Sequence, residues 1–173
     1  MAELDRGATL SCARAWRTPG ERMKPAEATI QTIEIDAGPS ECFDVASDLE
    51  SYPEWAGQVR KVVIHERDRA GRPIRATLSI DAMIKRIETT FNYVYDPPLV
   101  MSWTAEPGPD IKELDGSYQF QPIAGGTSVV YALKVVPSFD IPGFLRRQAE
   151  KQLVGTALRG LRERVHGRKH ETG

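Results

Sequence analysis

Seven stretches of the chain, beginning with Thr29–Asp36, are predicted to be strands, and apolar and polar residues alternate with a period of two in all of them except residues 58–67, whose faces are mixed. This period is typical of β-strands that turn one face to the protein interior. The other six stretches come after residue 57 and are separated by turn sequences such as Asp96-Pro97-Pro98 and Gly125-Gly126. They are residues 58–67, 74–83, 84–95, 99–106, 111–121 and 127–136. The pattern therefore predicts a meander of antiparallel strands.

The segment between the first two predicted strands favours two short helices. Gly38-Pro39 interrupts the strand pattern, and proline is well suited to the first turn of a helix. Ser51 and Glu54 have the spacing of a capping box in front of a second helix, which carries Trp55. Tyr52 is an alternative cap, because the proline that follows it disfavours a helical backbone at Tyr52.

A single long helix is predicted from Gly143 to about His166, with Gly167 as its stop. Its apolar residues recur at intervals of four, at Leu145, Ala149, Leu153, Ala157, Leu161 and Val165. A sheet with one apolar face must cover that face, and this helix is the only predicted element that is long enough. The order of elements thus predicts an α+β fold in which an antiparallel sheet packs against the C-terminal helix.

The alternation assigns large aromatic side chains to one face of the predicted sheet. They are Phe91, Tyr93, Trp103, Tyr118, Phe120 and Tyr131. A sheet curled around one helix forms a trough that the helix fills incompletely, so both a cavity and a solid core are compatible with this face. Gly116 on the same face leaves empty space, unless it marks a bulge or a close approach of the backbone.

The candidate chemistry of this face is hydrogen bonding rather than catalysis. Its polar groups are mainly the phenols of Tyr93, Tyr118 and Tyr131, which suit hydrogen bonding to a ketone or quinone oxygen better than base catalysis. No carboxylate or histidine lies on the predicted inner face, and only a bulge would turn Asp81 or Glu88 inward. The chain has no nucleophile elbow, phosphate-binding loop or dinucleotide motif, and we expect no catalytic residue, metal site or cofactor.

The composition is that of a soluble globular protein, with 173 residues, 40% hydrophobic and 27% charged. We expect one domain over residues 29–166, between a disordered leader over 1–28 and a flexible tail over 167–173. The net charge of −1 argues against DNA binding, and no stretch is long and apolar enough to span a membrane. Cys12 and Cys42 form no disulfide scaffold, which favours a cytoplasmic location.

Positive charge is concentrated at the C-terminal end of the chain. From Phe144 onward there are eight basic and three acidic residues, a net charge of +5. This pattern is typical of a solvated helix face whose basic residues suit the helix C-terminus. Transient contact with an anionic membrane surface, or with RNA, is an alternative interpretation. The exposed face would then include Arg146, Arg147, Lys151 and Arg159.

Several segments together resemble one family. They are "DLESYPEW" with the following "VRKV", "RDRAGRP", "YDPPLVMSW", "LDGSYQFQP", "GGTSVVY" and "IPGFLRRQAEK". Their order from about Thr29 to Val165 resembles the START-like superfamily, also called SRPBCC. Within it they are most similar to bacterial polyketide cyclase/dehydrase and lipid-transport proteins, which share a profile with coenzyme Q-binding START-type proteins. The resemblance implies a helix-grip fold, in which a curved antiparallel sheet wraps the C-terminal helix around a hydrophobic cavity.

The resemblance and the face pattern together imply a protein that holds a hydrophobic small molecule, such as a lipid, quinone or polyketide. The residues expected to line its cavity are Trp55, Leu78, Ile80, Phe91, Tyr93, Met101, Trp103, Tyr118, Tyr131, Leu145, Ala149 and Leu153. The two short helices, with Tyr52 and Trp55, would close one side of the sheet. One alternative is a polyketide cyclase or dehydrase acting in the same cavity. Another is a ribosome or protein interaction module, since some relatives of the coenzyme Q-binding group are described as ribosome-association toxins.

Overall fold

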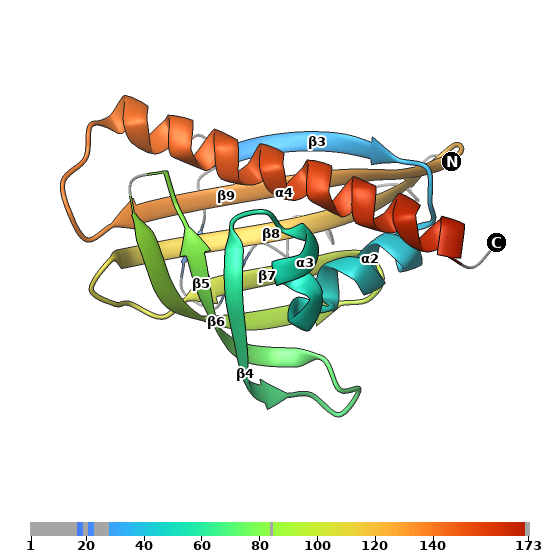
Figure 1. The fold of residues 1–173 in the computed structure, drawn as a ribbon, viewed down its shortest axis with the longest axis horizontal. Coiled ribbons are helices and arrows are strands. Elements are labelled where there is room, and N and C mark those ends of the chain that lie inside the picture. The colour runs from blue at the N-terminus through green and yellow to red at the C-terminus, as the bar shows by residue number, and fades with distance from the viewer. Residues whose placement is uncertain (1–16, 19–20, 23–27, 84, 172–173) are drawn as a thin grey trace, which may run out of the picture.

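The structure is a computed structural model that describes residues 17–18, 21–22, 28–83 and 85–171 (Figure 1). Its strands are β1 (Arg17–Thr18), β2 (Glu21–Arg22), β3 (Thr29–Ile35), β4 (Val59–Arg67), β5 (Pro73–Asp81), β6 (Arg86–Asp96), β7 (Val100–Ala105), β8 (Ile111–Ile123) and β9 (Gly126–Pro137). Its helices are α2 (Pro39–Ser47), α3 (Tyr52–Trp55) and α4 (Gly143–Glu171), and a short 3-10 turn, Leu49–Ser51, precedes α3. The predicted order of strand, two short helices, six strands and long helix is confirmed.

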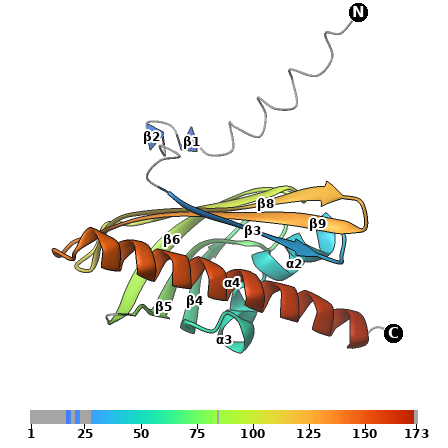
Figure 2. The same cartoon turned by 90° about the horizontal axis from the view of Figure 1, so that it is seen from above.

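Seven strands form one antiparallel sheet in the order β3-β9-β8-β7-β6-β5-β4. Figure 2 shows this sheet curling around α4, which lies along its concave side and packs against β3 and β9. Strands β4 to β9 pair as a meander because each is joined to the next by a short turn. Strand β3 pairs with the last strand, β9, and forms one edge of the sheet. The molecule therefore has the helix-grip fold expected from the sequence.

The predicted faces of the sheet hold for the strands that surround the concave side. Along β6, Ile87, Phe91 and Tyr93 are buried, and the residues between them are exposed or half-buried apart from Thr89, which shares the inner face. Two residues on the predicted solvent face of β8, Ser117 and Gln119, are buried nevertheless.

The C-terminal helix is longer than predicted, because α4 continues through Gly167 to Glu171. The residues after the glycine are basic, and positive charge at a helix C-terminus is favourable. Arg168 also forms an ion pair with Asp48, with Nη2 and Oδ2 3.2 Å apart. Five residues of the predicted flexible tail are thus helical. Most of the predicted leader lies outside the described residues; within it, β1 and β2 pair with each other.

Ser51 is the N-cap residue of α3, as one of the two predictions had it, but its side chain makes no capping hydrogen bond. The Ser51 hydroxyl does not cap the helix but donates to the carbonyl oxygen of Asp48 at 2.9 Å, and it accepts a hydrogen bond from the Trp55 indole at 3.1 Å. Tyr52 is the first residue of α3 and has helical backbone angles. The turn is therefore fixed by side-chain contacts around Ser51 rather than by a capping box.

The buried side of α4 has a different phase from the predicted one. Its buried residues recur at intervals of three and four and include Glu150, Val154, Leu158, Leu161 and Val165. A strict interval of four turns by about 40° beyond one full turn at each step, since the α-helix has 3.6 residues per turn. The predicted stripe therefore rotates by roughly 200° between residues 165 and 145, and its first members leave the core side.

Glu150 is a buried carboxylate that ties α4 to the edge of the sheet. Its Oε2 accepts a hydrogen bond from the Thr29 hydroxyl at 2.8 Å, and its Oε1 accepts one from the Val135 backbone N–H at 3.2 Å. The β3–β9 register ends at Thr29 and Leu133, so Val135 has no partner on β3. The carboxylate thus replaces the missing strand and satisfies a backbone group that burial would otherwise penalise.

Candidate functional site, an aromatic cavity

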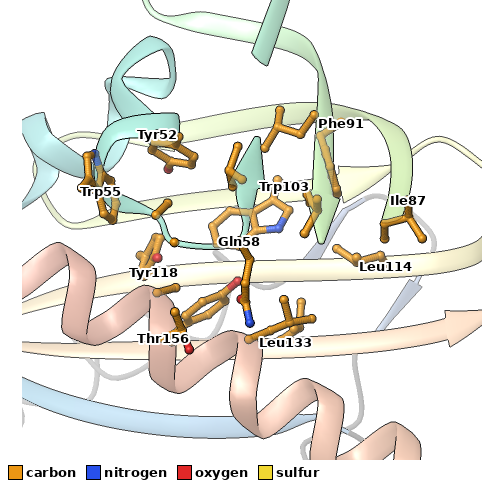
Figure 3. A pocket seen from close by; sticks show the side chains of 18 of the residues that line it. Tyr52, Trp55, Gln58, Ile87, Phe91, Trp103, Leu114, Tyr118, Leu133 and Thr156 are labelled. Carbon is orange, nitrogen blue, oxygen red and sulfur yellow. The ribbon is translucent and has the colours of Figure 1, made fainter. Parts of the chain in front are cut away.

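The concave side of the sheet contains a cavity of about 100 Å³ (Figure 3). It is enclosed by α3 and the segment after it, by the inner faces of β5, β6, β7, β8 and β9, and by one side of α4. Apolar side chains make up most of the lining. None of the described residues that line the cavity carries a carboxylate, an amine, a guanidinium or an imidazole. The cavity is therefore uncharged.

Most of the residues predicted to bind a ligand line this cavity. They are Trp55, Leu78, Ile80, Phe91, Tyr93, Trp103, Tyr118, Tyr131 and Leu153. These side chains come together because every second residue of a strand points to the same face, and the curled sheet brings these faces around one space.

Three predicted residues do not line the cavity. Met101 is completely buried, at the end of β7 against which α2 packs, so it belongs to the solid part of the core. Leu145 and Ala149 are half-buried, and they lie outside the lining because the four-residue interval drifts around α4.

The lining also includes residues that the sequence did not single out as site residues. Ile87, Leu114 and Leu133 belong to the predicted inner face, so the alternation of their strands was a sufficient signal. Thr156 lies on α4 beside Leu153, and predicting it would have required knowing which side of the helix faces the cavity. The segment Ala56–Val59 joins α3 to β4, and no periodic pattern predicts the course of such a connection.

Gly116 is explained by a close approach of a side chain rather than by empty space. A Cβ atom at this position would lie 2.3 Å from Cε2 of Trp103 on the neighbouring strand. The indole ring therefore lies directly against the backbone of β8. On the cavity side it contacts the rings of Tyr118 and Tyr131, with centroid distances of 5.3 Å and 5.5 Å. The glycine thus sets the position of this indole ring in the cavity.

The chain has five tyrosines, of which all but Tyr95 line the cavity, and the hydroxyls of the five fall into two groups. Those of Tyr52 and Tyr95 donate to backbone carbonyl oxygens, of Ala46 and Pro73 respectively. Those of Tyr93, Tyr118 and Tyr131 have no hydrogen-bond partner among the described residues. All three of these rings line the cavity. The three hydroxyl oxygens are not sealed off from the cavity space, so each can donate a hydrogen bond to a guest molecule.

Acidic side chains stay outside the cavity, as the alternation predicts. The β5–β6 register is regular over its whole length, so no bulge turns Asp81 or Glu88 inward. Hydrogen bonds from Arg86 and then from Arg60 lower the pKa of Asp81 to about 2, which keeps this carboxylate ionised on the outer face. Among the residues with described positions, no cluster of three His, Cys, Asp or Glu side chains is arranged to hold a metal ion.

The family model described as polyketide cyclase / dehydrase and lipid transport matches residues 28–166. The chain belongs to this family. Its matched region includes every element that encloses the cavity. Curated proteins gave no match to the chain. Within the described residues, no helix is both long and apolar enough to cross a lipid bilayer.

This member of the polyketide cyclase/dehydrase and lipid-transport family is similar in fold to several solved structures. A START superfamily protein from Mycobacterium smegmatis has a TM-score of 0.75 and 18% identity, over 81% of this chain and 97% of that one. A protein from Thermus thermophilus has a TM-score of 0.69 and 26% identity, with the same two coverages. The Zhui aromatase/cyclase from Streptomyces sp. R1128 has a TM-score of 0.73 and 15% identity, over 84% of this chain and 97% of that chain.

In this family member, the segment Leu49–Val59 forms a lid between one end of the cavity and α4. Trp55 lies so close to the helix that a Cβ atom on Gly160 would be 2.5 Å from the Trp55 carbonyl oxygen. At the surface, an ion pair between Glu54 of the lid and Arg164 of α4, with Oε2 and Nη2 2.9 Å apart, joins the same two segments. The lid is therefore held against α4 by one glycine contact and one exposed ion pair.

Burial raises the pKa values of the phenols of Tyr52, Tyr93, Tyr118 and Tyr131 above the ordinary value near 10. A folded-state pKa above the unfolded value means that the neutral phenol favours the fold, and that this contribution is lost as the pH rises. We expect the free energy of unfolding to fall above about pH 10, by about 1.4 kcal/mol per pH unit for each such tyrosine. Urea unfolding between pH 8 and pH 11 measures this fall.

Absorbance at 295 nm, which reports tyrosinate, provides the control for this expectation. The signal of the buried tyrosines should appear together with unfolding. If all five tyrosines of the chain titrated near pH 10 while the fold stayed intact, the phenols would not be shielded from solvent as described.

Proposed function

We propose that this protein binds a neutral, mainly apolar small molecule that carries a carbonyl or similar acceptor oxygen. The observation that carries the proposal is the presence of three phenol donors without partners among the described residues, those of Tyr93, Tyr118 and Tyr131, in an uncharged and mainly apolar cavity whose other polar side chains include Gln58 and Thr156. Small-molecule sites commonly combine such an apolar lining with a few placed polar groups. The absence of charged groups from the described lining favours a neutral ligand, because an ion would lose its hydration without a counter-charge.

The size of the cavity limits what this arrangement of the lid and α4 can hold. Its volume of about 100 Å³ compares with about 150 Å³ for an engineered apolar cavity that takes up benzene. Pockets for drug-sized ligands have about 300–1,000 Å³. A single ring or a short chain therefore matches the volume of the cavity in this structure. A polyketide, a quinone with its side chain or a lipid requires the lid Leu49–Val59 to move away from α4.

Membership in the polyketide cyclase/dehydrase and lipid-transport family supports a second candidate function, conversion of a polyketide in the same cavity. The likeness to the Zhui aromatase/cyclase agrees with the fold such an enzyme needs. The three phenols could polarise a ketone oxygen by donating to it. Their raised pKa values make them poor bases, however, and apart from the tyrosines the described lining contains no titratable group. Binding is therefore the function that these residues support best.

A matched pair of ligands tests the proposal. Acetophenone and ethylbenzene have similar shapes, but only the ketone has an acceptor oxygen. One net hydrogen bond contributes about 0.5–1.5 kcal/mol, so we expect acetophenone to bind about 2- to 12-fold more tightly, as measured by ligand-observed NMR titration. Equal affinities, or tighter binding of ethylbenzene, would contradict the role of the phenols. Solvent extraction of protein purified from its own cells, followed by mass spectrometry, would then identify the natural ligand, and conversion of a poly-ketone would favour the enzyme.

A further inference from the structure

Three connections meet at the end of the molecule where α4 begins (Figures 1 and 2). They are the β5–β6 turn, the β7–β8 loop and the loop from β9 to α4. Lys85 of the first forms an ion pair with Asp110 of the second, and its Nζ lies 5.7 Å from the centroid of the Phe139 ring in the third. The backbone N–H of Ser138 donates to the Asp110 carbonyl oxygen at 3.0 Å. These contacts join the three connections into one surface, which we call the loop end.

The loop end exposes large apolar side chains. Phe144, the second residue of α4, is 69% exposed, the highest value among the large apolar side chains that the structure describes. Met83 in the β5–β6 turn is 48% exposed. Single exposed apolar residues are common on protein surfaces and need no explanation. Here, however, two of them lie at the same end, and one is an aromatic ring held on a rigid helix.

Positive charge lies beside the exposed ring. Arg147 and Lys151 follow Phe144 at helical positions i+3 and i+7, so the three side chains lie on one side of α4, and all three are exposed. Within the described part of the chain, neither cation takes part in an ion pair. Further along α4, Arg164 pairs with Glu54 and Arg168 with Asp48, whereas Arg159 and Arg162 form no ion pair with the described residues. Two cations without an acidic partner among the described residues thus lie beside Phe144.

We propose that the loop end docks on an anionic lipid surface, with Phe144 entering the region between headgroups and acyl chains and Arg147 and Lys151 contacting lipid phosphates. An aromatic residue next to cations on one helix face is the arrangement that binds the interface of anionic membranes. A second copy of the chain is a poorer partner, because a symmetric contact would bring the same cations together. The docking is independent of what the cavity binds and goes beyond the proposed function.

The location of the loop end gives the docking a consequence for the cavity. Two of the cavity residues, Ile87 and Leu114, follow closely after the β5–β6 and β7–β8 connections. Figure 3 shows them at the opposite end of the cavity from Tyr52 and Trp55 of the lid. Docking would therefore hold this end of the cavity toward the lipid surface and leave the lid facing away from it.

Vesicle flotation with the full chain tests the docking. We expect binding to vesicles of about 70% phosphatidylcholine and 30% phosphatidylserine, and little binding to vesicles of phosphatidylcholine alone. A basic residue near an anionic surface contributes roughly fivefold to affinity, so the double variant Arg147→Glu/Lys151→Glu should bind at least about 25-fold more weakly. Phe144→Ala should reduce binding about tenfold, whereas Val94→Ala, at an exposed apolar residue of the outer sheet face, should not.

A second charge reversal separates docking from general attraction. Lys61→Glu/Arg69→Glu changes the net charge by the same amount at exposed positions on β4 and in the β4–β5 turn, and it should leave vesicle binding unchanged. Equal loss in both double variants would overturn the assignment of the loop end. Failure of the native chain to float with anionic vesicles, or stronger binding to polyuridylate than to them, would overturn the proposal. Circular dichroism confirms that each variant is folded, and Phe144→Trp should show a blue-shifted emission on binding.

Discussion

Gly116→Ala should destabilise the protein by about 3 kcal/mol, at the upper end of what overpacking costs. The added Cβ would lie 2.3 Å from Cε2 of Trp103, far inside van der Waals contact. The indole cannot move away easily, because the rings of Tyr118 and Tyr131 lie against it on the cavity side. The fold must therefore shift β8 away from β7 or displace the ring into the cavity. Urea unfolding measures the loss in free energy.

Two further comparisons show whether the contact with Trp103 causes the stability loss of Gly116→Ala. Gly108→Ala adds a methyl group at a position with nothing within 4 Å and should change stability by less than about 1 kcal/mol. In the background Trp103→Ala, the Gly116→Ala substitution should cost much less than in the native chain. If the cost were the same in both backgrounds, the effect would come from the strand backbone and not from the ring contact.

The alternation of the strands predicted the fold and most of the cavity lining, because the same physical rule determines both. A strand with a period of two has only two faces, and a curled sheet directs one face of every strand to the same space. Tyr93, Trp103, Tyr118 and Tyr131 could therefore be placed together although they are on four different strands. No contact between distant parts of the chain had to be known.

The features that the sequence did not predict depend on contacts between elements. Gly116 had several explanations until the position of Trp103 was known. Leu145 and Ala149 were misplaced because an interval of four fits a helix only over a few turns. The sequence alone does not show whether the hydroxyl of Tyr52 or that of Tyr118 has a hydrogen-bond partner. Only the structure distinguishes the one bonded to Ala46 from the one without a partner among the described residues.

This distinction between the tyrosines leads to the second large effect. Replacing Tyr93, Tyr118 and Tyr131 together by phenylalanine should weaken the binding of a carbonyl ligand about tenfold, near the upper end of what one net hydrogen bond contributes. The affinity for a hydrocarbon of the same shape should stay the same, because the rings and the apolar lining remain. Stability should not fall, since the three hydroxyls have no partner to lose among the described residues. Calorimetric or NMR titration with acetophenone and ethylbenzene measures both affinities.

Tyr52→Phe provides the matched control, because Tyr52 also lines the cavity but its hydroxyl donates to the Ala46 carbonyl oxygen. This variant should lose about 1 kcal/mol of stability and keep its affinity for the ketone. The triple variant should therefore lose affinity for the ketone and keep its stability, whereas Tyr52→Phe should lose stability and keep its affinity. A triple variant that binds the ketone as well as the native chain would show that the phenols do not hold the ligand. Equal losses for ketone and hydrocarbon would instead indicate a collapsed cavity, because only the loss of a donor distinguishes the two ligands.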